Sequence, residues 1–132
     1  MTAQDLLAKA IQAAASAKVL LDNGDADGAC NRAYYAMFDA ARAALLASGA
    51  PVEAEIAKTH NGLISAFSLY LVKTGRVPVE LGKALNRAEE LRLAADYKGD
   101  PVENEDAAWA VCQAETFVRA MQTTFMPKAP DG

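Results

Sequence analysis

Cysteine and histidine are scarce in this chain of 132 residues. The two cysteines, Cys30 and Cys112, are too few for a disulfide framework and lack the spacing of metal ligands. The single histidine, His60, argues against a zinc site built from imidazoles. The sequence therefore predicts a protein with reduced thiols, no bound metal and no cofactor.

Long hydrophobic runs and an excess of positive charge are lacking as well. No uncharged apolar stretch approaches the roughly 20 residues that a membrane span needs. The first ten residues carry Asp5 and Lys9 instead of the apolar centre of a signal peptide. A net charge of −4 disfavours a uniformly basic nucleic-acid binder but is compatible with a local arginine cluster. We expect a soluble, cytoplasmic protein that does not bind a membrane.

Glycine and proline are few, whereas alanine is abundant. The chain has 8 Gly and 5 Pro against 30 Ala, and alanine is the best helix former. This composition predicts an all-α protein. Between clear turn signals, apolar residues recur at steps of three and four, which predicts five helices. Their expected ranges are Ala3–Leu21, Asp25–Ala47, Asn61–Lys73, Val79–Ala95 and Glu105–Phe125.

Short connections between long helices predict an up-and-down bundle of four to five helices. We expect residues 1–126 to form this single domain and residues 127–132 to form a flexible tail. Thr2 with Asp5 suits the start of the first helix, and Asn104 suits the start of the last. The segment Val52–Thr59 fits a loop or a short helix equally well.

The third expected helix is apolar on two sides. Leu63, Phe67 and Leu71 share one side, whereas Leu69 and Val72 lie on the other. A helix that is apolar on two sides needs two partners, so this one could serve both the core and a contact with a second subunit.

A polar stripe runs along the second expected helix, opposite its apolar face. At 100° per residue it consists of Asn31, Arg32, Tyr35, Asp39 and Arg42. The pattern is typical of a solvated face with a weak ion pair. It also suits a face that binds phosphate or a subunit, because arginine grips phosphate through its planar fork and tyrosine is an amphipathic anchor.

A second group of candidate residues lies at the end of the fourth expected helix. Arg92 and Asp96 are spaced for a surface ion pair, and Tyr97 follows directly. An arginine, an aspartate and a phenol at a helix end could hold the phosphate of a nucleotide or of RNA. Glu89, three residues before Arg92, favours the simpler interpretation of a neutralised surface arginine.

The third candidate is His60, near the start of the third expected helix. A lone histidine in this position more often caps a helix or packs against it than catalyses a reaction. However, imidazole is the side chain best suited to proton transfer near neutral pH. His60 therefore stays a candidate for proton transfer.

Three strings together resemble the small bacterial HEPN-domain proteins. Asn31–Phe38 (NRAYYAMF) looks like their RAYYAMF segment, Lys58–Leu63 (KTHNGL) looks like their KTHxGL segment, and Arg92–Tyr97 looks like their RxxxDY ending. The strings occur in the family's order, and the resemblance extends from about Asp25 to Val118. It implies a homodimeric bundle of four to five helices, often encoded beside a minimal nucleotidyltransferase as a toxin–antitoxin-like pair.

Some HEPN proteins are metal-independent endoribonucleases, with an arginine followed a few residues later by a histidine. Here Arg92 matches the arginine, but Tyr97 stands in place of the histidine. A phenol is a poorer general base than imidazole at neutral pH. We therefore consider that His60, from another helix or from the second subunit, completes a cleft with Arg92 and Tyr97, while Arg32 and Arg42 supply positive potential.

Two alternatives to RNA cleavage remain open at this point. The dimer could be a non-catalytic module that binds a nucleotide or a partner nucleotidyltransferase through the same polar cleft. In related toxin pairs, the partner transfers a nucleotide to a tyrosine of the toxin, and Tyr97 is the candidate acceptor here. The sequence leaves open whether RNA is cleaved, and which RNA or nucleotide is bound.

Overall fold

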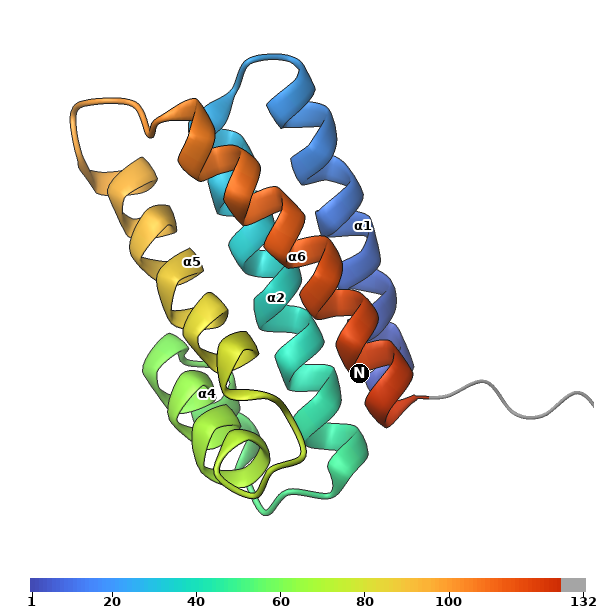
Figure 1. Ribbon diagram of the computed structural model, residues 1–132. Coiled ribbons are helices and arrows are strands. Elements are labelled where there is room, and N and C mark those ends of the chain that lie inside the picture. Colours follow the sequence, from blue (N-terminus) through green and yellow to red (C-terminus); the bar gives the residue numbers. More distant parts are fainter. Residues whose placement is uncertain (127–132) are drawn as a thin grey trace, which may run out of the picture.

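A computed structural model describes residues 1–126 and shows a bundle of helices (Figure 1). Four long helices form the bundle, and a shorter arm joins α2 to α5. The long helices are α1 (Ala3–Asp22), α2 (Ala26–Ser48), α5 (Val79–Tyr97) and α6 (Asn104–Phe125), and the arm contains α3 (Ala54–Ala57), α4 (His60–Phe67) and the π-helical turn η1 (Ser68–Val72). The described residues contain no strand, so the predicted all-α class is confirmed. The predicted tail at 127–132 lies outside them.

Membrane crossing needs a helix that is both long and strongly apolar. Across residues 1–126, none of the helices meets both conditions.

The helix ends follow local chemistry at α1 but not at α6. At α1, Thr2 and Asp5 form the predicted capping box: each side chain accepts the other's backbone N–H. The predicted cap at Asn104 is wrong, because Asn104 is already helical and Glu103 makes no capping hydrogen bond. Here the approach to the helix is set by a tertiary contact, since the N–H of Val102 donates to Asp27 on α2 at 2.9 Å.

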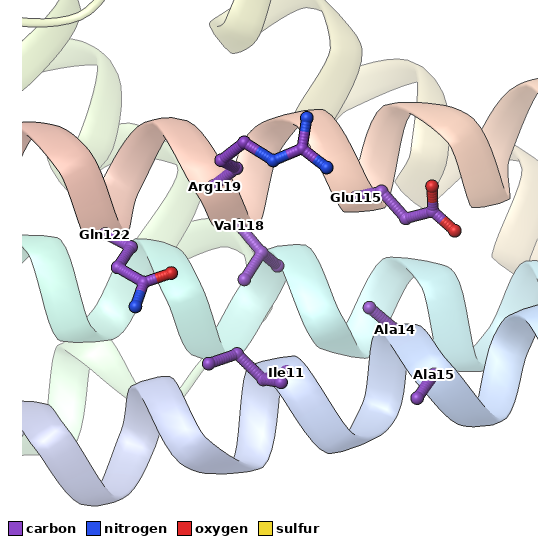
Figure 2. Close-up of a pocket in the computed structure, with 7 residues that line it drawn as sticks. All are labelled: Ile11, Ala14, Ala15, Glu115, Val118, Arg119 and Gln122. Carbon is purple, nitrogen blue, oxygen red and sulfur yellow. The ribbon is translucent and has the colours of Figure 1, made fainter.

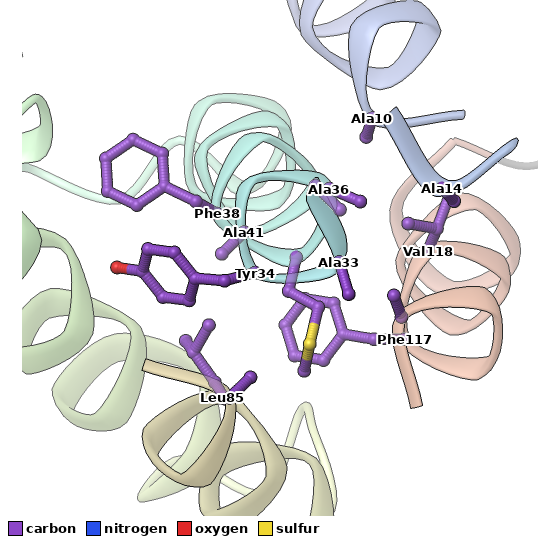
Figure 3. Packing of buried hydrophobic residues seen from close by; sticks show 14 of the residues in the cluster. Ala10, Ala14, Ala33, Tyr34, Ala36, Phe38, Ala41, Leu85, Phe117 and Val118 are labelled. Carbon is purple, nitrogen blue, oxygen red and sulfur yellow. The ribbon is translucent and has the colours of Figure 1, made fainter. Parts of the chain in front are cut away.

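Helix α2 lies at the centre of the bundle and packs against α1, α4, α5 and α6. Its predicted apolar face is buried, namely Cys30, Ala33, Tyr34, Met37, Phe38, Ala41 and Leu45. Burial also extends further round the helix, to Ala36, Ala40, Ala43 and Ala44. Figure 3 shows Ala33 and Ala36 between α2 and the facing helices α1 and α6, where small side chains permit close approach.

This wide burial narrows the polar face of α2. The prediction of a solvated stripe is wrong for most of its members, because only Arg32 is exposed. Asn31, Tyr35, Asp39 and Arg42 are half-buried. The physical reason is the central position of α2, which brings neighbouring helices over the edges of the stripe.

The arm between α2 and α5 resolves the segment left open by the sequence. Four of its residues form the short helix α3, and the helix expected over Asn61–Lys73 is α-helical first and π-helical afterwards. Leu63 and Leu71 are buried as expected, whereas Leu69 is 50% exposed. A subunit contact through Leu69 stays a prediction.

Candidate functional site

The start of α4 fixes the position of His60. The hydroxyl of Thr59 accepts the N–H of Gly62 at 3.0 Å and donates to the carbonyl of Ile56 at 3.0 Å. A Cβ atom at residue 62 would collide with the Ile56 carbonyl and the Thr59 hydroxyl, so this close approach needs glycine. The cap therefore makes His60 the first residue of the helix.

The imidazole of His60 is hydrogen-bonded to a buried phenol. The hydroxyl oxygen of Tyr34 lies 2.8 Å from Nδ1 of His60 and 3.0 Å from Oε2 of Glu89. Because these residues belong to α2, α4 and α5, the two bonds connect three helices. In Figure 3 the phenol oxygen of Tyr34 points away from the alanine-rich side of α2 and toward the green ribbon of α4.

Aromatic rings surround the imidazole on the α2 side. Its centroid lies 5.2 Å from that of Phe38, 5.5 Å from that of Tyr34 and 6.0 Å from that of Tyr35. The ring planes are tilted or edge-on to one another, as aromatic pairs prefer. These contacts hold the ring while leaving it half-buried and therefore open to a ligand.

Among residues 1–126, Arg92 is the one charged residue that is buried, and 6% of its surface is exposed. Its Nη1 donates to Asp96 at 3.3 Å, and Cζ lies 5.3 and 5.9 Å from the ring centroids of Tyr34 and Tyr35. Asn31 donates to the same Asp96 carboxylate. The predicted ion pair between Arg92 and Asp96 is present, but its position on the surface is wrong. The guanidinium lies instead against the tyrosine rings of α2.

One donor of this guanidinium has no partner. Nε of Arg92 is buried and makes no hydrogen bond within residues 1–126. Glu89, which the sequence suggested as a neutralising partner, instead accepts from Tyr34. A buried donor without a partner costs about 1–3 kcal/mol, which the rest of the fold must offset.

An open recess of about 400 Å³ brings these groups together. It is lined by Thr59, His60, Asn61, Glu89, Arg92 and Leu93. A guanidinium, an imidazole and the first turn of a helix thus border one space. The guanidinium and the helix start favour a bound anion, whereas the carboxylate of Glu89, which lines the same recess, opposes one.

Burial and neighbouring charges set the protonation of the phenol and the guanidinium. Burial, and then the nearby Glu89 carboxylate, raise the pKa of Tyr34 above its ordinary value, so the phenol keeps its proton at neutral pH. Burial alone would lower the pKa of Arg92. The hydrogen bond to Asp96 and the charges nearby outweigh it, so that the pKa of Arg92 is raised and the guanidinium stays charged.

Comparison with known proteins places the chain in a family. The HEPN domain matches residues 3–123. The chain belongs to the HEPN domain family. A UPF0332 protein of Gloeobacter violaceus is 37% identical over 118 residues, covering 88% of this chain and 90% of that protein. A UPF0332 protein of Thermotoga maritima is 41% identical over 109 residues, covering 80% and 77%.

A third relative carries a name that refers to function. A Methanocaldococcus jannaschii protein named "Putative toxin" is 35% identical over 115 residues, covering 87% of this HEPN chain and 82% of that protein. The resemblance noted from the three sequence strings is therefore confirmed at the level of the family.

The HEPN bundle brings some of the predicted site residues together and keeps others apart. Asp96, Tyr35 and His60 gather around Arg92 or its neighbouring rings. Tyr97 does not join them: it is 77% exposed and makes no side-chain hydrogen bond within the described residues.

The remaining predicted residues lie further along α2. Arg32 is exposed and makes no salt bridge among the described residues. Arg42 pairs loosely with Asp39 at 3.9 Å and lies 6.0 Å from the Phe38 ring centroid. Arg42 also lines a separate groove, of about 560 Å³, with Met1. The fold therefore does not bring Arg32, Arg42 and Arg92 into one cleft.

Two residues of the HEPN site escaped the sequence reasoning. The sequence places Tyr34 on the apolar face of its helix, where it does lie, and suggests Glu89 as a charge partner of Arg92. Their shared contact joins positions 55 residues apart, which no helical spacing reveals. Asn31 belonged to the polar stripe, and its bond to Asp96 could have been sought from that position.

Another groove of the bundle lacks these features. A space of about 330 Å³ lies between α1 and α6. Figure 2 shows Ile11 on α1 facing Val118 on α6, with Glu115 and Arg119 also on α6. This groove contains none of the predicted site residues. The recess beside His60 is therefore the candidate functional site.

Proposed function

We propose that this chain is the toxin-like half of a two-protein toxin–antitoxin pair and binds a phosphate group of RNA or of a nucleotide beside His60 and Arg92. The observation that carries the proposal is the buried guanidinium of Arg92, a residue that lines an open recess together with His60. The relatives named "Putative toxin" support the biological setting.

A phosphate would meet several complementary groups in the recess. Its oxygens are strong acceptors, and Arg92, which lines the recess, carries a planar guanidinium that suits phosphate. The first backbone N–H groups of α4, at His60 and Asn61, are not needed for hydrogen bonds within the helix, and the helix start favours negative charge. Bonds of this kind to a charged group contribute about 1.5–3 kcal/mol each.

The same residues are suited to cleaving RNA. His60 would take the proton of a ribose 2′-hydroxyl, whose oxygen forms a bond to phosphorus while the bond from phosphorus to the 5′-oxygen breaks. The departing 5′-oxygen takes a proton from water, and the hydroxide that remains takes the proton from His60. The products are a 2′,3′-cyclic phosphate and a 5′-hydroxyl. Arg92 would stabilise the charge that builds up on the phosphoryl oxygens.

A non-catalytic adaptor is the second candidate function. It is favoured by Tyr97, which replaces the histidine of the ribonucleases and points to no partner in the fold. As an adaptor, the protein would bind the phosphate in the recess without cleaving the RNA. The dimer expected for the family, or its nucleotidyltransferase partner, would then carry the biological role.

The binding test compares two arginines of the same helix. Arg92→Met removes the buried guanidinium, whereas Arg87→Met removes an exposed one that is paired with Glu90. Fluorescence anisotropy of a labelled single-stranded RNA, at fixed salt, should show binding at least tenfold weaker for Arg92→Met and almost unchanged for Arg87→Met. Equal affinities for the two variants would contradict the proposed site.

The cleavage test uses the same RNA in EDTA. Wild-type protein should release a fragment ending in a cyclic phosphate, and His60→Ala should not. If wild type leaves the RNA as intact as His60→Ala does while still binding it, the adaptor function replaces the enzymatic one.

The partner test rests on the exposed phenol of Tyr97. A nucleotidyltransferase encoded beside this chain would join the phenol oxygen to the α-phosphorus of a nucleoside triphosphate and release pyrophosphate. Co-purification of the two proteins, followed by intact-mass measurement, should show one added nucleotidyl group on wild type and none on Tyr97→Phe. A sedimentation mass near that of one chain would contradict the expected homodimer.

A further inference from the structure

We infer that Glu89 and Tyr34 hold the imidazole of His60 in a single tautomer, in which Nδ1 keeps its proton and all proton exchange takes place at Nε2. Glu89 and Tyr34 would then be positioning residues for whatever His60 does in the recess. That role rests on the proposed function, whereas the tautomer itself follows from the hydrogen bonds alone.

The first step is the number of protons available to the phenol. Tyr34 has one hydroxyl proton and two partners, Nδ1 of His60 at 2.8 Å and Oε2 of Glu89 at 3.0 Å. A carboxylate offers only acceptor oxygens, so the phenol must donate to Glu89. The oxygen of Tyr34 can then only accept from His60, which requires a proton on Nδ1.

The second step is that the phenol cannot act as a phenolate. Tyr34 is fully buried, and burial beside the Glu89 carboxylate keeps its proton in place. The direction of both hydrogen bonds is therefore the same throughout the neutral pH range. The chain runs from Nδ1–H of His60 to Tyr34, and from the Tyr34 hydroxyl to Glu89.

The third step is that the arrangement fits both charge states of the imidazole. Neutral His60 donates from Nδ1 and has a lone pair on Nε2, while protonated His60 still donates from Nδ1 and has gained a proton on Nε2. None of the hydrogen bonds within residues 1–126 involves Nε2. Nothing in the chain of bonds must rearrange when Nε2 gains or loses a proton.

The fourth step separates this role from simple packing. A phenylalanine would fill nearly the same volume as Tyr34 and keep its contacts with neighbouring rings. The hydroxyl adds only the two bonds to His60 and Glu89. Its two partners, His60 and Glu89, both line the recess. In Figure 3 the hydroxyl points away from the labelled alanines of α2.

The experiment uses the fact that the chain contains one histidine. Nitrogen-15 NMR of the side chain reports directly which ring nitrogen carries the proton. For neutral His60 in wild type we expect a protonated Nδ1 and an unprotonated Nε2, the reverse of the tautomer that free histidine prefers. A wild-type spectrum of the Nε2–H tautomer would overturn the inference without the need for any variant.

Two variants then test the cause. Tyr34→Phe should return most of the population to the Nε2–H tautomer, and Glu89→Gln should shift part of it. Glu90→Gln is the matched control, because Glu90 is the exposed neighbour on α5 and pairs with Arg87. A Tyr34→Phe protein that is folded but keeps the wild-type tautomer would show that the phenol is not responsible.

Failure of this inference and failure of the proposed function give different results. If Arg92→Met loses RNA binding and the wild type has the Nε2–H tautomer, the proposed function is supported and the inference about the His60 tautomer is overturned. If the wild type has the expected Nδ1–H tautomer but binds no RNA, the inference about the His60 tautomer is supported and the proposed RNA binding is overturned. If RNA is cleaved, Tyr34→Phe should lower kcat and leave KM nearly unchanged, because the phenol acts through His60.

Discussion

Replacing Arg92 with methionine should abolish the proposed phosphate binding at little cost in stability. The guanidinium is buried and lacks a partner for Nε among the described residues, so the fold bears the cost of desolvating it. Methionine has a similar length and no polar donor, and can fill the space beside the rings of Tyr34 and Tyr35. The variant therefore separates what Arg92 does for the fold from what it does for a ligand.

The opposing contributions are of similar size. The bond to Asp96, whose carboxylate is partly exposed, is worth ~0.5–1 kcal/mol. The two contacts with tyrosine rings add about 1 kcal/mol each. Against these, removal of the unpartnered donor recovers about 1–3 kcal/mol. The net change in the free energy of unfolding should therefore lie between a gain of about 0.5 and a loss of about 2 kcal/mol.

Urea denaturation, followed by circular dichroism, measures this change. Arg87→Met on the same helix is the control and should be neutral within about 0.5 kcal/mol, because its side chain is half exposed. A loss of more than about 2 kcal/mol in Arg92→Met would mean that the guanidinium is held by the fold for structural reasons. The argument that Arg92 is kept for binding phosphate would then fail.

Three further predictions concern other parts of the bundle. Gly62→Ala should remove the Thr59 cap, lower the free energy of unfolding by about 1–2 kcal/mol in thermal denaturation and weaken RNA binding, since α4 then starts differently. Burial raises the pKa of Asp39 above its ordinary 3.8, so the contribution of Asp39 to stability falls as pH rises from 3.8 through the raised value. Asp39→Asn should therefore be the more stable protein at neutral pH, and the difference should vanish below pH 3.8 in parallel urea titrations. Burial also raises the pKa of Cys30 to about 11, whereas Cys112 is exposed, so a thiol reagent should modify one cysteine in the native protein and both in denaturant.

The sequence by itself determined the four long helices of this protein. Turn residues, caps and the spacing of apolar side chains act within a few neighbours along the chain, so they can be read without the fold. The capping box of Thr2 and Asp5 and the buried side of α2 were both accessible in this way. Three short strings were enough to indicate the HEPN family as well.

Only the tertiary structure decided which of these residues form a site. The i,i+4 spacing of Arg92 and Asp96 is the same on a wet surface and in a buried contact, and the packing of α5 on α2 made it the latter. Three helices converge, and this brings the side chains of His60, Tyr34 and Glu89 into contact. Tyr97, next to Asp96 in sequence, is exposed to solvent. Periodicity reports which side of a helix is apolar, but burial depends on which helix stands opposite, and that choice is made by the whole chain.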